Sequence, residues 1–317
     1  MLPKGNKLLF ETIIGFFTKQ KYSLKFKNTK SMILVTGATG HLGTATIEHL
    51  LKNTTAGNIV AFARDENKAW HLKEKGVEVR IGNFDDTASL DKAMQGIEKV
   101  LLISTIDHHR IQQHKNVIDA AKKASIKHIA YTGVSLKDVN TSAIKILMES
   151  HFQTEDYIKE SGLAYTFLRN TLYTDIIPMH VGEKVFETGI FVPAGNGKVP
   201  YALRREMGEA AANALLQNGH ENKTYEITGS ELYSYSDVAQ TLSELSGKNI
   251  AYTDVEATAF SEQLKQGGVP DFLAFLKTGF ATDIKNNQFG IVSKDLETLI
   301  GRKPTSLKDS LKGIYNL

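Results

Sequence analysis

The amino-acid sequence predicts an α/β fold: a doubly wound parallel sheet of the Rossmann type with a smaller C-terminal α/β lobe that shapes a substrate pocket. Short apolar segments alternate with amphipathic helical patterns from Met32 onward. The first apolar segment ends in a glycine-rich turn, and the alternation stops after Asn170, where irregular Gly- and Pro-bearing sequence follows. Strands that alternate with helices on this scale form a parallel sheet, whose ligands bind at the carboxyl ends of the strands.

Six segments of the first part are expected to be buried strands because they are short and apolar. They are residues 32–36, 59–63, 77–81, 99–103, 127–131 and 165–168. Between them, apolar residues recur at helical spacing, most clearly in residues 42–51, 111–121 and 144–160. Together these elements define a nucleotide-binding domain over residues 32–170.

The smaller lobe is expected to span residues 171–317 and to cover the cleft. Irregular sequence over residues 178–200 precedes a predicted helix over 205–217 and a predicted strand over 224–228. A helix over residues 236–246 follows, and short helices complete the chain.

Composition limits the function classes that are open to the chain. Its 317 residues include no cysteine, which excludes disulfides, thiol nucleophiles and thiolate metal sites. No segment approaches the roughly 20 uninterrupted apolar residues of a membrane span, and we expect a cytoplasmic protein. Of the formal net charge of +3, residues 32–317 carry −3, because residues 1–31 hold seven lysines and one acid. The body of the chain therefore gives no case for nucleic-acid binding.

Residues 1–31 have three interpretations. Glu11 interrupts their apolar run and no small-residue cleavage site follows, which argues against a secretory signal. A membrane-surface helix would use the apolar side chains that lie beside the lysines. We favour the third interpretation, a dispensable basic extension, because the first strand begins directly at Met32.

A glycine triplet in the sequence G-A-T-G-H-L-G ends the first predicted strand and opens a helix. Gly37 permits the tight turn, Gly40 lets the backbone approach a pyrophosphate, and Gly43 allows close packing of helix on strand. Unpaired N–H groups at the start of the helix would face the anion. The alternative is a plain Gly-rich strand–helix turn. The residues predicted to bind a dinucleotide are Gly37, Ala38, Thr39, Gly40, His41, Leu42 and Gly43.

The residues that follow the second predicted strand indicate which of the two nicotinamide cofactors is preferred. An acid about 20 residues after the glycine triplet binds the ribose 2′-hydroxyl of NAD. This chain instead has Arg64, 21 residues past Gly43, with Lys68 one helical turn later. A guanidinium and an ammonium favour the 2′-phosphate, so we predict that NADPH binds more tightly than NADH. Asp65 follows immediately and weakens this preference, and the alternative is a solvated charged loop.

With these motifs the chain resembles the atypical short-chain dehydrogenase/reductases of the NmrA-like group, and within that group the bacterial NAD(P)H:quinone oxidoreductase 2 and triphenylmethane reductase type. The resemblance covers all but the first 31 residues. It is carried by residues 37–43, 103–105, 127–132, 165–170, 219–225 and 299–301. It implies further cofactor contacts from Ser104, Thr105 and Ile106, and from Asn170 within residues 168–173. Asn83 departs from the aspartate common in relatives, which weakens the expected adenine contact.

Ordinary short-chain dehydrogenases use a Tyr-x-x-x-Lys pair on the helix after the fifth strand, where the tyrosine donates a proton. If Glu155 matches the family's glutamate, His151 takes the lysine position and Leu147 the tyrosine position. The missing pair favours an acceptor that takes up hydride without a protein acid, such as a quinone or a cationic dye. We expect His151, held by Glu155, to position the nicotinamide ribose or the acceptor. The alternative is a hydrogen-bonded core pair.

The segment after the sixth predicted strand is expected to line the acceptor pocket. Aromatic, hydroxyl and thioether side chains there suit a flat ligand, although each of them would also suit the core. They are Tyr173, Thr174, Met179 and Phe191. A second polar set, Asp107, His108, His109 and His114, resembles a metal cluster. Its spacing matches no common ligand pattern, so we expect no metal.

These observations predict an NADPH-dependent oxidoreductase that transfers hydride to a quinone or a similar conjugated acceptor. The alternative is an NmrA-like redox sensor that binds the dinucleotide without turnover. Reduction of a simple ketone is disfavoured, because Leu147 cannot donate a proton. The expected partner is a small quinone-like acceptor. A homodimer is also compatible with the sequence.

Overall fold

The computed structural model describes residues 31–317, so the predicted extension over residues 1–31 lies outside the described residues except for Ser31. Seven parallel strands form the main sheet in the order β3-β2-β1-β4-β5-β6-β8. The strands are β1 (Ile33–Val35), β2 (Ile59–Ala63), β3 (Glu78–Ile81), β4 (Lys99–Ile103), β5 (His128–Val134), β6 (Ala164–Asn170) and β8 (Lys223–Ile227). All six predicted strands are present, which confirms the doubly wound α/β fold. The strand order reverses between β1 and β4, and a ligand crevice lies at the carboxyl ends of such strands.

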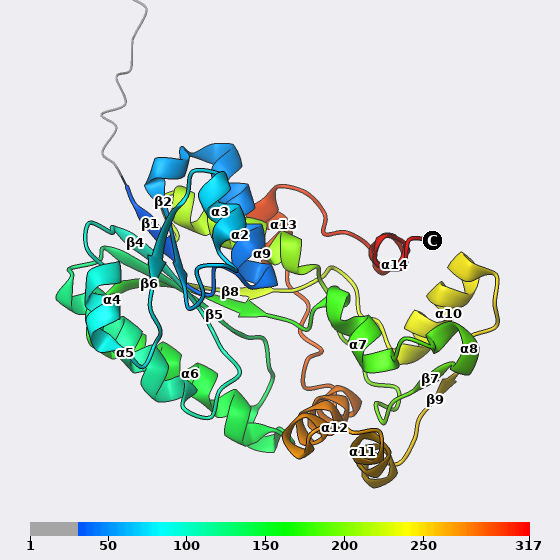
Figure 1. Cartoon of the computed structure of the whole chain (residues 1–317). Helices are drawn as coiled ribbons and strands as arrows, with labels where there is room; N and C mark the ends of the chain where they lie inside the picture. The colour runs from blue at the N-terminus through cyan, green and yellow to red at the C-terminus, as the bar shows by residue number, and fades with distance from the viewer. Residues whose placement is uncertain (1–30) are drawn as a thin grey trace, which may run out of the picture. The chain divides into compact units, whose positions relative to one another are not determined.

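Helices cover both faces of this sheet (Figure 1). One layer contains α2 (His41–Asn53), α3 (Trp70–Glu74), α9 (Arg204–Leu216) and α13 (Asp295–Ile300). The other contains α4 (Thr87–Ala93), α5 (Arg110–Lys123) and α6 (Lys145–Ser161). Successive strand residues face opposite sides, and in β1 Ile33 and Val35 pack with the α2 layer while Leu34 packs with the α5 layer. Burial on both faces explains why the strands are apolar throughout.

A third apolar core holds the smaller lobe together and surrounds the short parallel pair of β7 (Ile190–Phe191) and β9 (Tyr252–Thr253). The helices of this lobe are α7 (Ile177–Val181), α8 (Val185–Thr188), α10 (Tyr235–Ser246), α11 (Ala257–Gln266), α12 (Asp271–Lys285) and α14 (Leu307–Tyr315). Short 3-10 turns are η1 (Ala56–Asn58), η2 (Val139–Thr141) and η3 (Thr174–Ile176). Leu147 and Met148 of α6 also pack in this core. The N-terminal turns of α6 therefore join the two lobes.

Two elements that were predicted to belong to the smaller lobe belong to the main sheet layers instead. The strand expected over residues 224–228 is β8, which pairs in parallel with β6. The helix expected over residues 205–217 is α9, which packs directly on α2. Gly208 makes this close approach feasible, because a Cβ atom there would lie 2.8 Å from the Cβ of Ala45. The prediction was wrong because the chain leaves the sheet after β6 and later returns, and local sequence patterns do not report such a return.

Within residues 31–317, no helix has both the length and the apolar character needed to cross a membrane.

Candidate functional site

The glycine triplet forms the turn between β1 and α2, as predicted. Gly37 has φ +59°, a conformation that favours glycine, and its carbonyl accepts a hydrogen bond from the Gly40 N–H at 3.0 Å. A Cβ atom on Gly43 would lie 2.3 Å from the Gly37 oxygen and 2.8 Å from the Ala38 Cα. The helix can therefore begin this close to the strand only with glycine at position 43.

The start of α2 is open to a ligand. Gly40 is the N-cap and supplies no side-chain hydrogen bond, and the first turn of the helix contains no acidic residue. Gly37, Gly40 and His41 are exposed, and Thr39 is half-buried. The first N–H groups of a helix are positively polarised and have no partner within the helix. This 13-residue helix therefore directs a polarised end at the carboxyl edge of the sheet.

Arg64 follows the last residue of β2 and is exposed, as is Lys68. Within residues 31–317 the Arg64 guanidinium has no carboxylate partner. The neighbouring Asp65 carboxylate accepts hydrogen bonds from the backbone N–H groups of Asn67 at 2.9 Å and Lys68 at 3.4 Å. The Asp65 carboxylate is thus hydrogen-bonded within its own turn and does not pair with Arg64. The positive charge of Arg64 remains available to an anionic ligand.

The loop after β4 carries Ser104, Thr105 and Ile106, which are the contacts implied by the family resemblance. The Ser104 N–H donates to the Thr132 hydroxyl at 3.0 Å, and the Thr105 carbonyl accepts from the Arg110 guanidinium at 3.0 Å. Ile106 is 69% exposed at the end of this loop. Hydrogen bonds therefore fix the start of the loop, while its apolar tip faces outward.

The polar residues that follow this loop face different partners. The Asp107 carboxylate accepts from the His109 N–H at 2.8 Å, and the His108 ring lies 4.5 Å from the ring of Phe272. His114 Nδ1 lies 2.9 Å from the Thr154 hydroxyl. Nowhere in residues 31–317 do three or more His, Asp or Glu side chains converge as a metal would require.

His151 lies inside the molecule, with 7% of its surface exposed. Its Nδ1 and the hydroxyl of the fully buried Tyr131 are 2.9 Å apart and share a hydrogen bond. Burial, helped by the nearby Arg110 guanidinium, lowers the pKa of His151 well below that of a free imidazole. Burial also raises the pKa of Tyr131. Both side chains are therefore neutral around pH 7.

The expectation that Glu155 holds His151 is wrong. Glu155, which is 2% exposed, instead binds Arg169 of β6 through two contacts, Nε to Oε1 at 2.9 Å and Nη2 to Oε2 at 2.6 Å. A bidentate guanidinium–carboxylate pair satisfies both oxygens of the buried acid. Sequence gave no signal for this partner, because Arg169 lies on a different element.

Leu147, the residue predicted to take the tyrosine position, is buried in the core of the smaller lobe. Its carbonyl accepts a hydrogen bond from the guanidinium of Arg110, a residue that sequence reasoning did not single out. Arg110 is only 2% exposed, although it stands at the first position of α5 beside two exposed histidines. Such a position is typical of a surface residue, so its burial could be found only in the structure.

Buried hydroxyls gather at the carboxyl ends of β5 and β6. Val134 pairs with Asn170 in register, and each is followed by a hydroxyl residue, Ser135 and Thr171, which are 0% and 2% exposed. Neither hydroxyl has a hydrogen-bond partner in the part of the chain that the structure describes. A buried polar group without a partner is unfavourable. Asn170 itself is 5% exposed in the same row.

Two of the four predicted pocket residues line one cavity. Met179 and Phe191 lie at a pocket of about 310 Å³, together with Phe260, His180 and Lys277. Burial lowers the pKa of His180 to about 4, so this wall carries a neutral imidazole beside the Lys277 ammonium. Neither Tyr173 nor Thr174 lines this pocket, and the Tyr173 ring instead lies 5.5 Å from the guanidinium carbon of Arg204.

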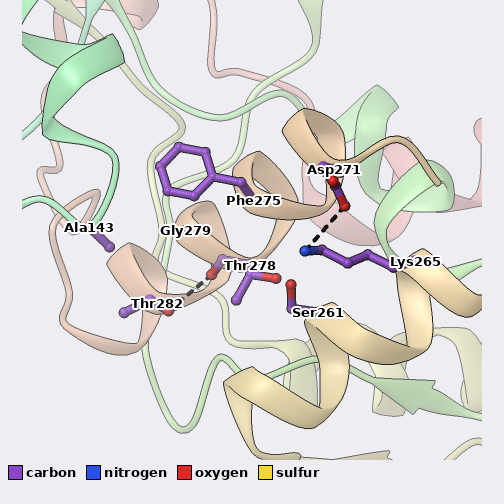
Figure 2. A pocket seen from close by; sticks show the side chains of 8 residues that line it. All are labelled: Ala143, Ser261, Lys265, Asp271, Phe275, Thr278, Gly279 and Thr282. Carbon is purple, nitrogen blue, oxygen red and sulfur yellow. Dashed lines mark hydrogen bonds and ion pairs between the residues drawn. The ribbon is translucent and has the colours of Figure 1, made fainter.

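A second pocket, of about 300 Å³, was not predicted (Figure 2). It lies between α11 and α12, with Ala143 opposite, and the 3.1 Å ion pair of Lys265 and Asp271 stands at its side. The glycine turn lines neither of the two pockets. The features that agree with the predicted nucleotide site are the strand order and the open start of α2.

The comparisons with known proteins identify the family. The NmrA-like family matches residues 29–312. This chain belongs to the NmrA-like family. It is 39% identical over 290 residues to quinone oxidoreductase 2 of Escherichia coli, covering 90% of this chain and 99% of that protein. The expected NmrA-like relationship and its reductase branch are confirmed.

Two solved structures of the family match over nearly their whole length. The NADPH-dependent quinone oxidoreductase of Escherichia coli, complexed with NADPH, has a TM-score of 0.85 and 37% identity, covering 90% of this chain and 100% of that one. Triphenylmethane reductase of Citrobacter, complexed with NADP(H), has a TM-score of 0.84 and 40% identity, covering 89% of this chain and 99% of that one.

Proposed function

We propose that this family member is an NADPH-dependent oxidoreductase that transfers hydride to a quinone or a similar conjugated acceptor. The observation that carries the proposal is the pairing of two features at one edge of the sheet, the uncapped start of α2 and the Arg64 guanidinium without a carboxylate partner. The first suits a pyrophosphate and the second a 2′-phosphate. The quinone oxidoreductase and triphenylmethane reductase relatives support the same activity.

The residues present fit a nicotinamide dinucleotide. Gly37 and Gly40 carry no side chains at the turn between β1 and α2, and Ser104–Ile106 lies at the end of the adjacent strand β4. The unpartnered hydroxyls of Ser135 and Thr171 offer donors to a bound carbonyl or carboxamide oxygen. When bound, NADPH supplies the hydride. We propose that Asn170 stands at the same end of the site.

The absence of a suitable proton donor on α6 favours a conjugated acceptor. Leu147 is apolar, and burial keeps His151 neutral and bonded to Tyr131. A quinone that takes up hydride becomes a delocalised anion, which water can protonate afterwards. A simple ketone would instead form a strongly basic alkoxide and would require an acid at the moment of transfer.

We propose that the acceptor reaches the site from the smaller lobe. Met179, Phe191 and Phe260 provide apolar surface for a flat ring in the pocket of about 310 Å³. His180 and Lys277, in the same wall, provide polar groups for ring oxygens. A cytoplasmic location and a homodimer stay predictions, to be checked by fractionation and by sedimentation.

The test is NADPH oxidation by the purified protein with and without a quinone, together with calorimetric titration of NADPH and NADH. We expect NADPH to bind more tightly and to be consumed only when the quinone is present. Tight binding of NADPH without turnover on any quinone or dye would favour the sensor function. Failure to bind either dinucleotide would contradict both functions.

A further inference from the structure

We propose that Arg110 is a positioning residue that supplies a fixed positive charge near the acceptor, and that this charge selects acceptors that become anionic when they take up hydride. Arg110 contacts the carbonyl of Leu147, which packs in the same apolar core as the pocket residue Val181. The inference rests on the proposed function and extends it to the charge of the acceptor. It predicts that neutral quinones are preferred over cationic dyes of similar size.

Arg110 joins the loop after β4 to helix α6. Its Nη1 donates to the Thr105 carbonyl at 3.0 Å and its Nε to the Ser150 hydroxyl at 2.9 Å. Its Nη2 contacts the Leu147 carbonyl and the same hydroxyl. One guanidinium therefore holds the predicted cofactor loop against the helix that carries the vacant tyrosine position.

All hydrogen-bond acceptors of Arg110 are neutral. Within residues 31–317 no carboxylate forms an ion pair with it. The aromatic side chains near it are His114 of α5, Tyr131 of β5 and His151 of α6, and all three are uncharged around pH 7 because of their burial. Glu155 of α6, which acts electrostatically on Tyr131, is already paired with Arg169. The charge of Arg110 is therefore not cancelled by its surroundings.

A guanidinium keeps its proton even when burial lowers its pKa, as it does for Arg110. A buried charge without a counter-ion is costly, and in a folded protein it usually has a partner. In ordinary short-chain dehydrogenases a lysine four residues after the tyrosine provides a positive charge. Here that position holds the neutral His151, and the charge comes from the neighbouring helix α5 instead.

The charge change of the acceptor decides how a fixed cation acts on the reaction. Hydride carries two electrons and a proton, so a neutral quinone gains one negative charge and the donor gains one positive charge. A cationic triphenylmethane dye becomes neutral in the same step. A buried, weakly screened cation stabilises the new anion of the quinone and opposes the binding of the cationic dye. The proton that completes the hydroquinone comes from water.

The test compares the two acceptor classes in Arg110→Gln and Arg110→Lys variants. We expect Arg110→Gln to lower kcat/KM for a neutral naphthoquinone about 10-fold and to leave or raise kcat/KM for the cationic dye. Arg110→Lys keeps the positive charge, so the ratio of quinone to dye kcat/KM should stay within a few fold of the ratio in the unaltered protein. Loss of loop order alone would lower kcat/KM for both acceptors together. The ratio of kcat/KM for the quinone to kcat/KM for the dye therefore separates an effect of charge from an effect of structure.

Arg80 provides a matched control, because it also donates to backbone carbonyls, those of Ala93 at 2.6 Å and Gln95 at 2.7 Å. It lies on β3, the edge strand of the sheet. Arg80→Gln should leave the quinone-to-dye ratio unchanged. A parallel loss of both activities in Arg110→Gln that Arg110→Lys does not restore would overturn the inference while leaving the proposed function intact.

A binding measurement on the unaltered protein covers the case in which Arg110→Gln does not fold. With NADP⁺ present, so that no turnover occurs, titration compares a hydroxynaphthoquinone that is anionic at neutral pH with a neutral methylnaphthoquinone. We expect the anion to bind about 10-fold more tightly. Equal or weaker binding of the anion would overturn the inference. If neither quinone binds or is reduced, both the inference about Arg110 and the proposed function are contradicted.

Discussion

The Tyr131 hydroxyl lies 2.9 Å from Nδ1 of His151, and this contact joins the middle of β5 to α6. Both side chains are buried, so each satisfies a polar atom of the other away from water. His151, which we predict to take the lysine position of ordinary short-chain dehydrogenases, therefore has a partner within the protein. Its contribution to catalysis is expected to be positional.

The first prediction concerns His151. We expect His151→Ala to raise the KM values for cofactor and acceptor, with a loss of kcat well below the roughly 10²–10⁴-fold that is typical of a general acid. Loss of the partner of Tyr131 should also lower the free energy of unfolding by about 1–3 kcal/mol. Steady-state kinetics and urea denaturation measure the two effects. A 10⁴-fold loss of kcat with unchanged cofactor affinity would identify His151 as the proton donor.

A second prediction concerns the pH dependence of stability. Burial, with a contribution from Arg110, lowers the pKa of His114 to about 3, whereas an unfolded histidine titrates near 6.5. Below pH 6.5 the unfolded chain therefore binds a proton that the folded chain excludes, and stability falls by about 1.4 kcal/mol per pH unit for this residue. His114→Asn should reduce the slope between pH 6.5 and 5 in urea denaturation. The exposed His109→Asn is the control, and equal slopes in both variants would contradict the assignment.

The third prediction tests the choice of cofactor. Arg64→Ala should narrow the preference for NADPH over NADH by about 1.5–3 kcal/mol, the scale of a charge-assisted contact to phosphate. Calorimetric dissociation constants for both cofactors give this difference directly. Arg205→Ala on α9 removes another exposed arginine and should leave the preference unchanged. If the ratio of the two constants does not change in Arg64→Ala, the 2′-phosphate is bound elsewhere.

A fourth prediction uses the close contact at the glycine turn. Gly43→Ala would place a Cβ atom 2.3 Å from the Gly37 oxygen, so the turn must open and NADPH binding should fall by at least 10-fold. Thermal stability should fall as well. Gly313→Ala in α14 is the matched control, because nothing lies within 4 Å of its added Cβ, and it should be neutral or stabilising by up to about 1 kcal/mol. Normal NADPH affinity in Gly43→Ala would refute the proposed loop geometry.

The fifth prediction concerns residues 1–31, whose removal should leave cofactor affinity and the melting temperature unchanged. The sheet begins at β1 with Ile33, and the family match begins at residue 29, so a chain that starts at Met32 keeps every described strand. Calorimetry and thermal denaturation of the shortened protein measure both quantities. A lower melting temperature or an insoluble product would show that the segment packs on the folded body.

Local features of this fold could be predicted from sequence, and long-range ones could not. The turn from β1 to α2 was predicted because its glycines, strand and helix are contiguous in the chain. The pairing of β8 with β6 was missed because the paired residues are 57 positions apart in the sequence and the chain passes through the smaller lobe between them. The candidate site follows the same rule: Arg64 was predicted from its sequence separation from Gly43, whereas the burial of Arg110 depends on contacts with α6.

The path of the chain between β6 and α9 has a consequence for how acceptor preference can change. β6 ends at Asn170 and α9 starts at Arg204, and the segment between them supplies Met179 and Phe191 to the proposed acceptor pocket. Its two ends are anchored to helices and strands that pack on the main sheet, while its middle packs in the core of the smaller lobe, to which Val134 of β5 and Leu147 of α6 also contribute. We therefore expect that this segment can be exchanged between relatives. Replacing it with the corresponding segment of a relative that uses another acceptor should change the surface that binds the acceptor ring. The glycine turn between β1 and α2 would stay the same.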